Sequence, residues 1–244
     1  MFVESPARSH PGVPWLLADV VLVIVTVVLF VVAISNESVP FVIAAAATGL
    51  LALAITVSFY MLQPNQAGVL MLFGAYRGTD RTPGLRIANP LYSTTKISLR
   101  VRNFTTTTSK VNDANGTPIE IAAVVVWRVT DTAQASFGVD EFVDYVETQS
   151  ESAVRQLART YPYDKWDDSD VTTLIGATGE INDQLLAELQ DRATEAGVEV
   201  LESRITDLAY APEIADSMLR RQQASAIVAA RVKIVEGAVM MVRD

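Results

Sequence analysis

The sequence predicts an α+β domain that is preceded by a two-helix membrane hairpin and followed by one long C-terminal helix. Three observations predict this architecture. Two apolar runs occupy residues 14–62, segments of strand length follow from residue 63, and helical spacing begins after Asp131 and ends the chain. The chain therefore consists of a membrane part and a water-facing part, and its average composition describes neither.

The composition excludes several kinds of protein. The 244 residues include no cysteine and one histidine, His10. There is therefore no disulfide framework or thiolate metal site, and no imidazole cluster or Ser-His-Asp triad. The 28 acidic and 19 basic residues give a formal net charge of −9, which argues against a basic nucleic-acid-binding face. We expect neither a cofactor nor a nucleic-acid partner.

The two apolar runs predict transmembrane helices over residues 14–35 and 41–62. Asp19 is the only charged residue from Pro14 to Ile34, and the run from Phe41 to Leu62 has none. As helices these runs are about 31 and 33 Å long, and a hydrocarbon core is about 30 Å thick. Buried helices of a soluble protein are the alternative, but they would carry more polar residues. We therefore expect contact with membrane lipids.

The charges around the hairpin predict its orientation. The connecting loop holds Glu37 and no lysine or arginine, whereas Arg8 precedes the first run and Arg77, Arg81 and Arg86 follow the second. The positive-inside rule then predicts a cell-membrane protein with two spans, a cytoplasmic tail over residues 1–13 and a cytoplasmic domain. A re-entrant hairpin would leave both ends on that same side.

Three side chains near the cytoplasmic ends of the two runs are expected at the membrane interface. Trp15 and Tyr60 lie at the same face of the hairpin, as in an aromatic belt. Asp19 lies near the end of its run, where its carboxylate is expected to reach the headgroup layer rather than act inside the membrane.

Residues 63–211 predict the α+β domain. Gly197 is expected to end the second of its two amphipathic helices, and Asn115-Gly116 favours a tight hairpin turn. A switch from strand-like to helical periodicity at Asp131 supports this order of elements. The expected strands cover residues 67–78, 84–87, 95–111, 118–129 and 198–210, and the expected helices cover residues 142–161 and 171–196.

Residues 212–244 predict a long helix that mediates assembly, opened by Pro212. Its apolar residues follow two rows at near-heptad spacing, which are expected to form one broad stripe for helix–helix packing. The rows contain Met218, Val228, Val232, Val235 and Val239, and Ile227, Ile234 and Met241. No later element covers them, so we expect another copy of the chain to do so. The pattern is unfinished at Asp244, and the natural protein is expected to continue.

The order of these elements resembles the SPFH or band 7 superfamily, which includes stomatins, prohibitins, flotillins and HflK-HflC proteins. Within it, the chain is most similar to prokaryotic stomatin-like membrane proteins. No one motif is diagnostic, but their order and spacing over residues 63–244 are specific. The matching stretches are residues 63–76, 82–85, 89–90, 115–131, 142–155, 197–200 and 204–208.

The resemblance implies a membrane-anchored scaffold without catalytic residues. Members of this superfamily form large rings or cages, organise membrane microdomains and hold or regulate membrane proteins, including proteases. The alternative is a membrane-tethered hydrolase or metal-dependent enzyme that uses the loop of residues 164–170. Its carboxylates (Asp164, Asp167, Asp168 and Asp170) suit a divalent cation, although a helix cap and solvated loop charges explain them more simply.

Overall fold

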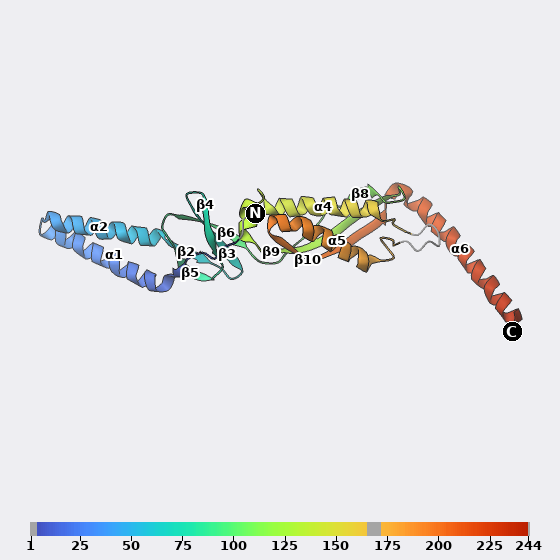
Figure 1. The fold of residues 1–244 in the computed structure, drawn as a ribbon, viewed down its shortest axis with the longest axis horizontal. Helices are drawn as coiled ribbons and strands as arrows, with labels where there is room; N and C mark the ends of the chain where they lie inside the picture. The colour runs from blue at the N-terminus through green and yellow to red at the C-terminus, as the bar shows by residue number, and fades with distance from the viewer. Residues whose placement is uncertain (1–3, 165–171, 244) are drawn as a thin grey trace. The chain divides into compact units, whose positions relative to one another are not determined.

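The structure is a computed structural model that describes residues 4–164 and 172–243. The chain forms two compact units, coloured by residue number in Figure 1. The first unit contains the described residues of 1–102, 127–146 and 192–199. The second contains the described residues of 103–126, 147–191 and 200–244. Each unit is described by itself below.

Both apolar runs are helical and pack against each other in the first unit. Helix α1 spans Gly12–Ser35 and helix α2 spans Val39–Val57, and they lie side by side in Figure 1. The residues buried between them are small and include Ala33, Ala45 and Ala52. Small residues let two membrane helices approach closely, which is how such helices pack where water is absent.

The second helix ends earlier than the sequence predicts. The helix was expected to reach Leu62, but Phe59–Leu62 is strand β2, which pairs with strand β5 (Gly84–Ile87). Leu62 is 2 % exposed because it faces the protein, not lipid. Apolar composition is the same for a membrane helix and a buried strand, so the run by itself does not reveal this boundary.

Two small sheets complete the first unit. Strand β5 lies between β2 and β1 (His10–Pro11). In the other sheet, β3 (Gln66–Leu72) is the central strand between β4 (Ala75–Asp80) and β6 (Tyr92–Ser98). The run expected as one strand over residues 67–78 is therefore a hairpin.

The strand predicted over residues 95–111 is wrong, because this segment forms parts of three strands. Strand β6 ends at Ser98, and β7 (Arg102–Thr105) and β8 (Ser109–Asn112) join β9 (Pro118–Val129) instead. The Thr106 hydroxyl accepts a hydrogen bond from the Ala123 amide at 2.9 Å, which interrupts the strand between β7 and β8. Alternating hydrophobicity continues through such a break, so it does not show that the chain changes sheets.

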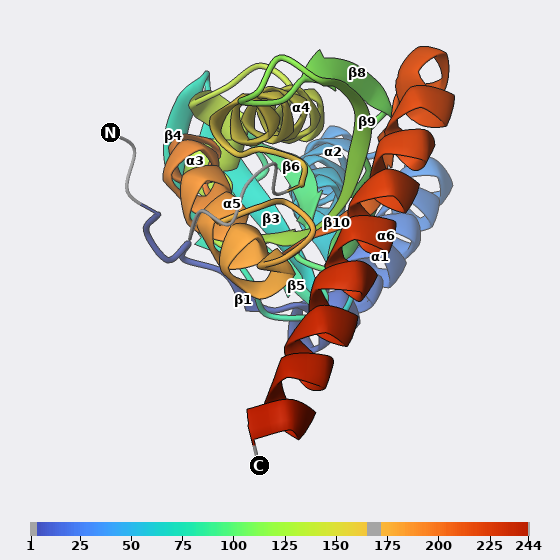
Figure 2. The same ribbon diagram turned by 90° about the vertical axis from the view of Figure 1, so that its right-hand side faces the viewer.

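Strand β10 (Val198–Tyr210), helix α4 (Phe142–Thr160) and a turn at residues 115–116 confirm three expected elements. Helix α3 (Thr132–Phe137) was not expected, and α5 (Thr178–Ala193) begins later than residue 171. In the second unit α4 and α5 lie over the sheet (Figures 1 and 2). Asn182 and Gln190 of α5 accept hydrogen bonds from two β10 amides, which covers part of that edge strand.

Gly197 ends the helical segment as predicted, after the short 3₁₀ helix Thr194–Ala196. Its φ of 65° is in the left-handed region. A Cβ there would lie 2.3 Å from the Asp131 carbonyl oxygen, so the position requires glycine for its conformation and for its space.

Replacing Gly197 by alanine is therefore expected to lower the thermal unfolding midpoint of the detergent-solubilised protein. Gly116→Ala is the matched control, since Gly116 also has a positive φ (78°) but open space around it. The left-handed conformation alone costs about 1–2 kcal/mol in each variant. The overlap adds to this cost only at Gly197, and equal losses of stability in the two variants would contradict it.

Candidate membrane anchor and assembly helix

The outer surfaces of α1 and α2 are apolar and uncovered. In each helix, only 11 % of the most apolar stretch of 18 residues is buried in the protein. Large side chains such as Leu17, Ile24 and Leu53 are more than half exposed. A core helix of a soluble protein would bury such residues, because each gains about 1.5–3 kcal/mol on leaving water. Both helices are also long and apolar enough to span a membrane, which is consistent with membrane association.

Asp19 does not lie on the surface of the hairpin as the sequence led us to expect. It is 7 % exposed, and its Oδ2 atom accepts a hydrogen bond from the Thr56 hydroxyl of α2 at 2.9 Å. A second polar contact, 3.0 Å between the hydroxyls of Thr26 and Thr48, lies further along the same interface. These contacts join α1 to α2. Thr56 was missed because one threonine in an apolar run gives no signal.

The two aromatic residues expected at the interface lie on different elements. Trp15 is on α1 and is 46 % exposed. Tyr60 is on strand β2, where its hydroxyl donates to Asp80 Oδ2 at 2.7 Å. Burial and the adjacent carboxylate raise the pKa of Tyr60, so it remains a neutral donor. Tyr60 therefore connects β2 to Asp80 of β4 through its hydroxyl.

Asp80 is the centre of a polar cluster in the first unit. Besides Tyr60, it accepts hydrogen bonds from the Ser9 hydroxyl at 2.7 Å and from Arg86 at 3.2 Å. Burial opposes ionisation of Asp80, but the hydrogen bonds from the Thr82 amide, Ser9 and Tyr60 outweigh it and lower its pKa. The carboxylate is thus charged at neutral pH and holds three separate segments together.

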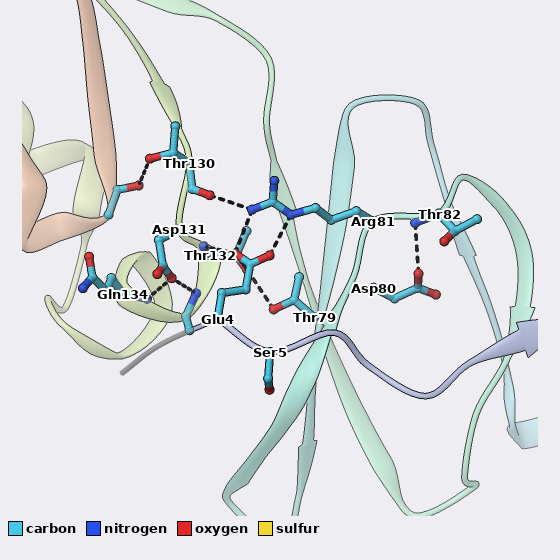
Figure 3. Close-up of polar contacts among 12 residues, drawn as sticks. Glu4, Ser5, Thr79, Asp80, Arg81, Thr82, Thr130, Asp131, Thr132 and Gln134 are labelled. Atoms are coloured by element: carbon cyan, nitrogen blue, oxygen red, sulfur yellow. Dashed lines mark hydrogen bonds and ion pairs between the residues drawn. The ribbon is translucent and has the colours of Figure 1, made fainter. Parts of the chain in front are cut away.

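Residues 4–11, here called the N-terminal strap, are docked on the first unit rather than forming a free tail. Glu4 forms two hydrogen bonds of 2.7 Å with the Arg81 guanidinium (Figure 3). The same carboxylate accepts hydrogen bonds from the amide and hydroxyl of Thr132, at 2.9 and 3.0 Å. The Thr79 amide donates to the Ser5 carbonyl at 2.8 Å.

Gly78 allows this close approach. A Cβ at that position would lie 2.8 Å from the Cα atom of Ala7. The strap and its receptor strand are more than 70 residues apart in sequence, so spacing does not reveal their contact. Its only sequence signal is a glycine inside a strand, which often marks a close backbone approach.

The first turns of helix α6 (Pro212–Arg243) are fixed to the second unit. The Ala211 amide donates to the Pro118 carbonyl at 3.0 Å, and Glu213 pairs with Lys110 of β8. The ring of Tyr210 packs on Tyr163 at a centroid distance of 4.1 Å. Tyr163 is held in turn by its amide, which donates to the buried Asp113 carboxylate at 2.9 Å.

Beyond these turns α6 is uncovered in the part of the chain that the structure describes. Of the predicted assembly residues, Met218 is half-buried beside Tyr210 and Arg221. The others are at least 50 % exposed: Ile227, Val228, Val232, Ile234, Val235, Val239 and Met241. At 3.6 residues per turn, the valine row and the row of Ile227, Ile234 and Met241 are centred roughly 130° apart around the helix.

Comparison with family models identifies the domain. The model of the SPFH domain / Band 7 family matches residues 60–238, which is more than half of the chain. The chain belongs to the SPFH/Band 7 family. A search of curated proteins found no match. The matched region begins within β2 and ends within α6, so it includes parts of both units and excludes α1 and α2.

The metal-binding alternative for this SPFH protein falls largely on residues that are not described. Of the acidic loop, Asp164 is described, whereas Asp167, Asp168 and Asp170 lie outside the described residues. Within residues 4–164 and 172–243, no group of three or more histidine, aspartate or glutamate side chains is arranged to hold a metal ion.

Removing the Arg81 guanidinium is expected to loosen the strap of the SPFH protein. Arg81→Ala should raise the hydrogen-exchange rate of the Thr79 amide by about fivefold, since an exposed ion pair contributes up to about 1 kcal/mol. Arg77→Ala, which changes an exposed arginine of the preceding strand β4, is the control. Unchanged exchange in Arg81→Ala would show that the ion pair does not hold the strap.

The strap is also expected to respond to acid. Burial raises the pKa of Glu4, but the Arg81 and Thr132 contacts lower it by more, to below 4.5 overall. A lowered folded-state pKa means that this stabilisation is complete above pH 4.5 and is lost as the pH falls through the lowered value. In Arg81→Ala the strap should be released at a higher pH than in the unmodified protein. The same Thr79 exchange, followed against pH, measures this shift.

Proposed function

We propose that this SPFH protein is a membrane-anchored scaffold whose copies assemble through α6. In this role it organises membrane microdomains and holds or regulates partner membrane proteins, a membrane protease among them. A scaffold acts by binding other molecules through its surfaces, so this role requires no catalytic side chain. Membership of the SPFH/Band 7 family is consistent with such a role, and the exposed apolar rows of α6 are the observation that carries the proposal.

The arrangement of the rows supports assembly beyond a dimer. An apolar stripe that packs on one neighbour is about 100° wide, whereas the two rows of α6 are centred roughly 130° apart. One partner helix therefore covers one row and leaves the other in water. If each copy packs on two neighbours, both rows are covered, as in a ring or an array.

The strap supports a hairpin topology. Strand β1 precedes α1 and pairs with β5, while β2 follows α2 and pairs with the same β5. The two ends of the α1–α2 pair are thus joined to one sheet, which supports a topology with both ends on one side of the membrane. Arg8, Arg77, Arg81 and Arg86 flank the pair on that side, and the positive-inside rule assigns it to the cytoplasm.

Charge placed on either row is expected to reduce assembly. In mild detergent the unmodified protein should migrate at many times its 26.5 kDa chain mass. Val232→Asp with Val239→Asp removes one row, and Ile234→Asp with Met241→Asp removes the other. Gln222→Asp with Gln223→Asp is the control, because it adds the same charge to the same helix without removing an apolar residue.

The pattern of losses distinguishes two kinds of contact. If each row packs on the same row of a neighbouring copy, a variant that keeps only one row should have the mass of a dimer. If unlike rows pack together, each variant alone should be monomeric, and mixing the two should restore heterodimers. A monomeric unmodified protein, or no change in mass in both row variants, would contradict assembly through α6.

The proposed orientation can be read from cysteine accessibility, since the chain has no native cysteine. Ser5→Cys and Arg100→Cys should react with a membrane-impermeant maleimide only in inverted vesicles. Glu37→Cys, in the loop between the helices, should react only from the opposite side. Labelling of all three from one side would indicate a re-entrant hairpin, and labelling of Ser5→Cys and Arg100→Cys from opposite sides would contradict the topology.

A further inference from the structure

Two apolar side chains are exposed at one end of the β4-β3-β6 sheet. Phe73, in the turn between β3 and β4, is 84 % exposed, and Leu91, in the turn before β6, is 59 % exposed. Leu72 pairs with both Ala75 and Tyr92, so the two turns are neighbours. Phe73 and Leu91 are here called the apolar tip.

Phe73 is an unusual residue for its turn. Its φ is 49° and that of Gly74 is 83°. A two-residue hairpin turn with two positive φ values favours Asn-Gly, whose first side chain is polar and tolerates this conformation. Phenylalanine there is strained and places an aromatic ring in water, and a Cβ at Gly74 would meet nothing within 4 Å. Strain and apolar exposure at one position indicate a contact outside the chain.

The apolar tip lies close to the point where α2 ends. The Ala88 amide donates to the carbonyl of Ser58, the C-cap residue of α2, at 3.1 Å. Leu91 follows Ala88 by three residues, so their Cα atoms are at most about 11 Å apart. The headgroup region on each side of a bilayer is itself about 5–8 Å thick. The tip is therefore within reach of the membrane that holds α2.

The charges near the tip also suit a lipid surface. Residues 59–76 and 87–95 contain no charged side chain. The first charges beyond them are Arg77, Arg86 and Lys96, all of them basic, and Arg77 and Lys96 are exposed. Basic residues beside an apolar insertion are attracted to anionic headgroups, whereas acidic residues would be repelled.

We propose that the apolar tip inserts into the headgroup layer of the membrane that holds the hairpin. This contact rests on the proposed membrane anchoring and adds a third attachment to those made by the strap and by β2. Three attachments that are not in line fix the orientation of the first unit relative to the bilayer, whereas two leave it free to tilt about the line between them.

The experiment measures the depth of a fluorophore in the full chain, reconstituted in vesicles that contain anionic lipid. An environment-sensitive dye is attached to Ala75→Cys, beside the tip, to Ile24→Cys on the exposed surface of α1, or to Arg100→Cys. Arg100 lies near the opposite end of the same sheet, about 20 Å away along β3. Nitroxides on the lipid acyl chain, placed near the headgroup in one set of vesicles and near the bilayer centre in another, together quench any dye that reaches the membrane.

Each label is compared in the native background and with Phe73→Asn and Leu91→Ser. This pair removes the apolar tip, and Phe73→Asn installs the residue that the turn favours, so the thermal unfolding midpoint should not fall. We expect quenching at Ala75 and Ile24 but not at Arg100. Quenching at Ala75 alone should fall about threefold or more in the variant, because its two substituted side chains no longer gain from leaving water.

The other outcomes overturn the proposal in distinguishable ways. Quenching at Ile24 without quenching at Ala75 rejects insertion of the tip and leaves the anchoring intact. Absence of quenching at Ile24 rejects the anchoring itself. A blue-shifted but unquenched dye at Ala75 shows that another copy of the chain covers the tip, and equal quenching at Ala75 and Arg100 shows that the contact is not specific to it.

Discussion

The apolar surface of α1 and α2 is the constraint on which the other features depend. Outside their narrow mutual contact, these helices present valine, leucine, isoleucine and phenylalanine side chains to their surroundings. Such a surface is stable in hydrocarbon and costly in water, which is consistent with a membrane around the helices. The protein supplies the polar contacts inside the pair, where Asp19 meets Thr56 and Thr26 meets Thr48.

The strap and β2 connect the two apolar helices to the SPFH domain. Both pair with β5, and the Asp80 carboxylate accepts hydrogen bonds from Ser9 of the strap, Tyr60 of β2 and Arg86 of β5. Because the three segments share one charged and largely buried acceptor, the departure of any one of them removes a hydrogen bond from a buried carboxylate. The anchor and the first unit are therefore held together by directional contacts as well as by covalent connection.

The second unit supplies a different kind of surface. Its α4 and α5 cover a sheet whose core includes Ile119, Leu157 and Leu185, each no more than 2 % exposed. Helix α6 leaves this core with only its first turns fixed, and its apolar rows remain uncovered in the described chain. Exposed apolar helices are costly in water, which is why assembly of several copies is the proposed role of this element.

The sequence by itself determined the features that depend on local composition and periodicity: the two apolar helices, the Gly197 cap, strands β9 and β10, helix α6 and membership of the SPFH family. Contacts between distant residues were decided only by the tertiary structure. The end of α2 at Val57, the break of the 95–111 strand, the docking of Glu4 on Arg81 and the burial of Asp19 each depend on a partner elsewhere in the chain. The local hydrophobic pattern indicates which residues are buried, but it does not indicate which part of the chain covers them.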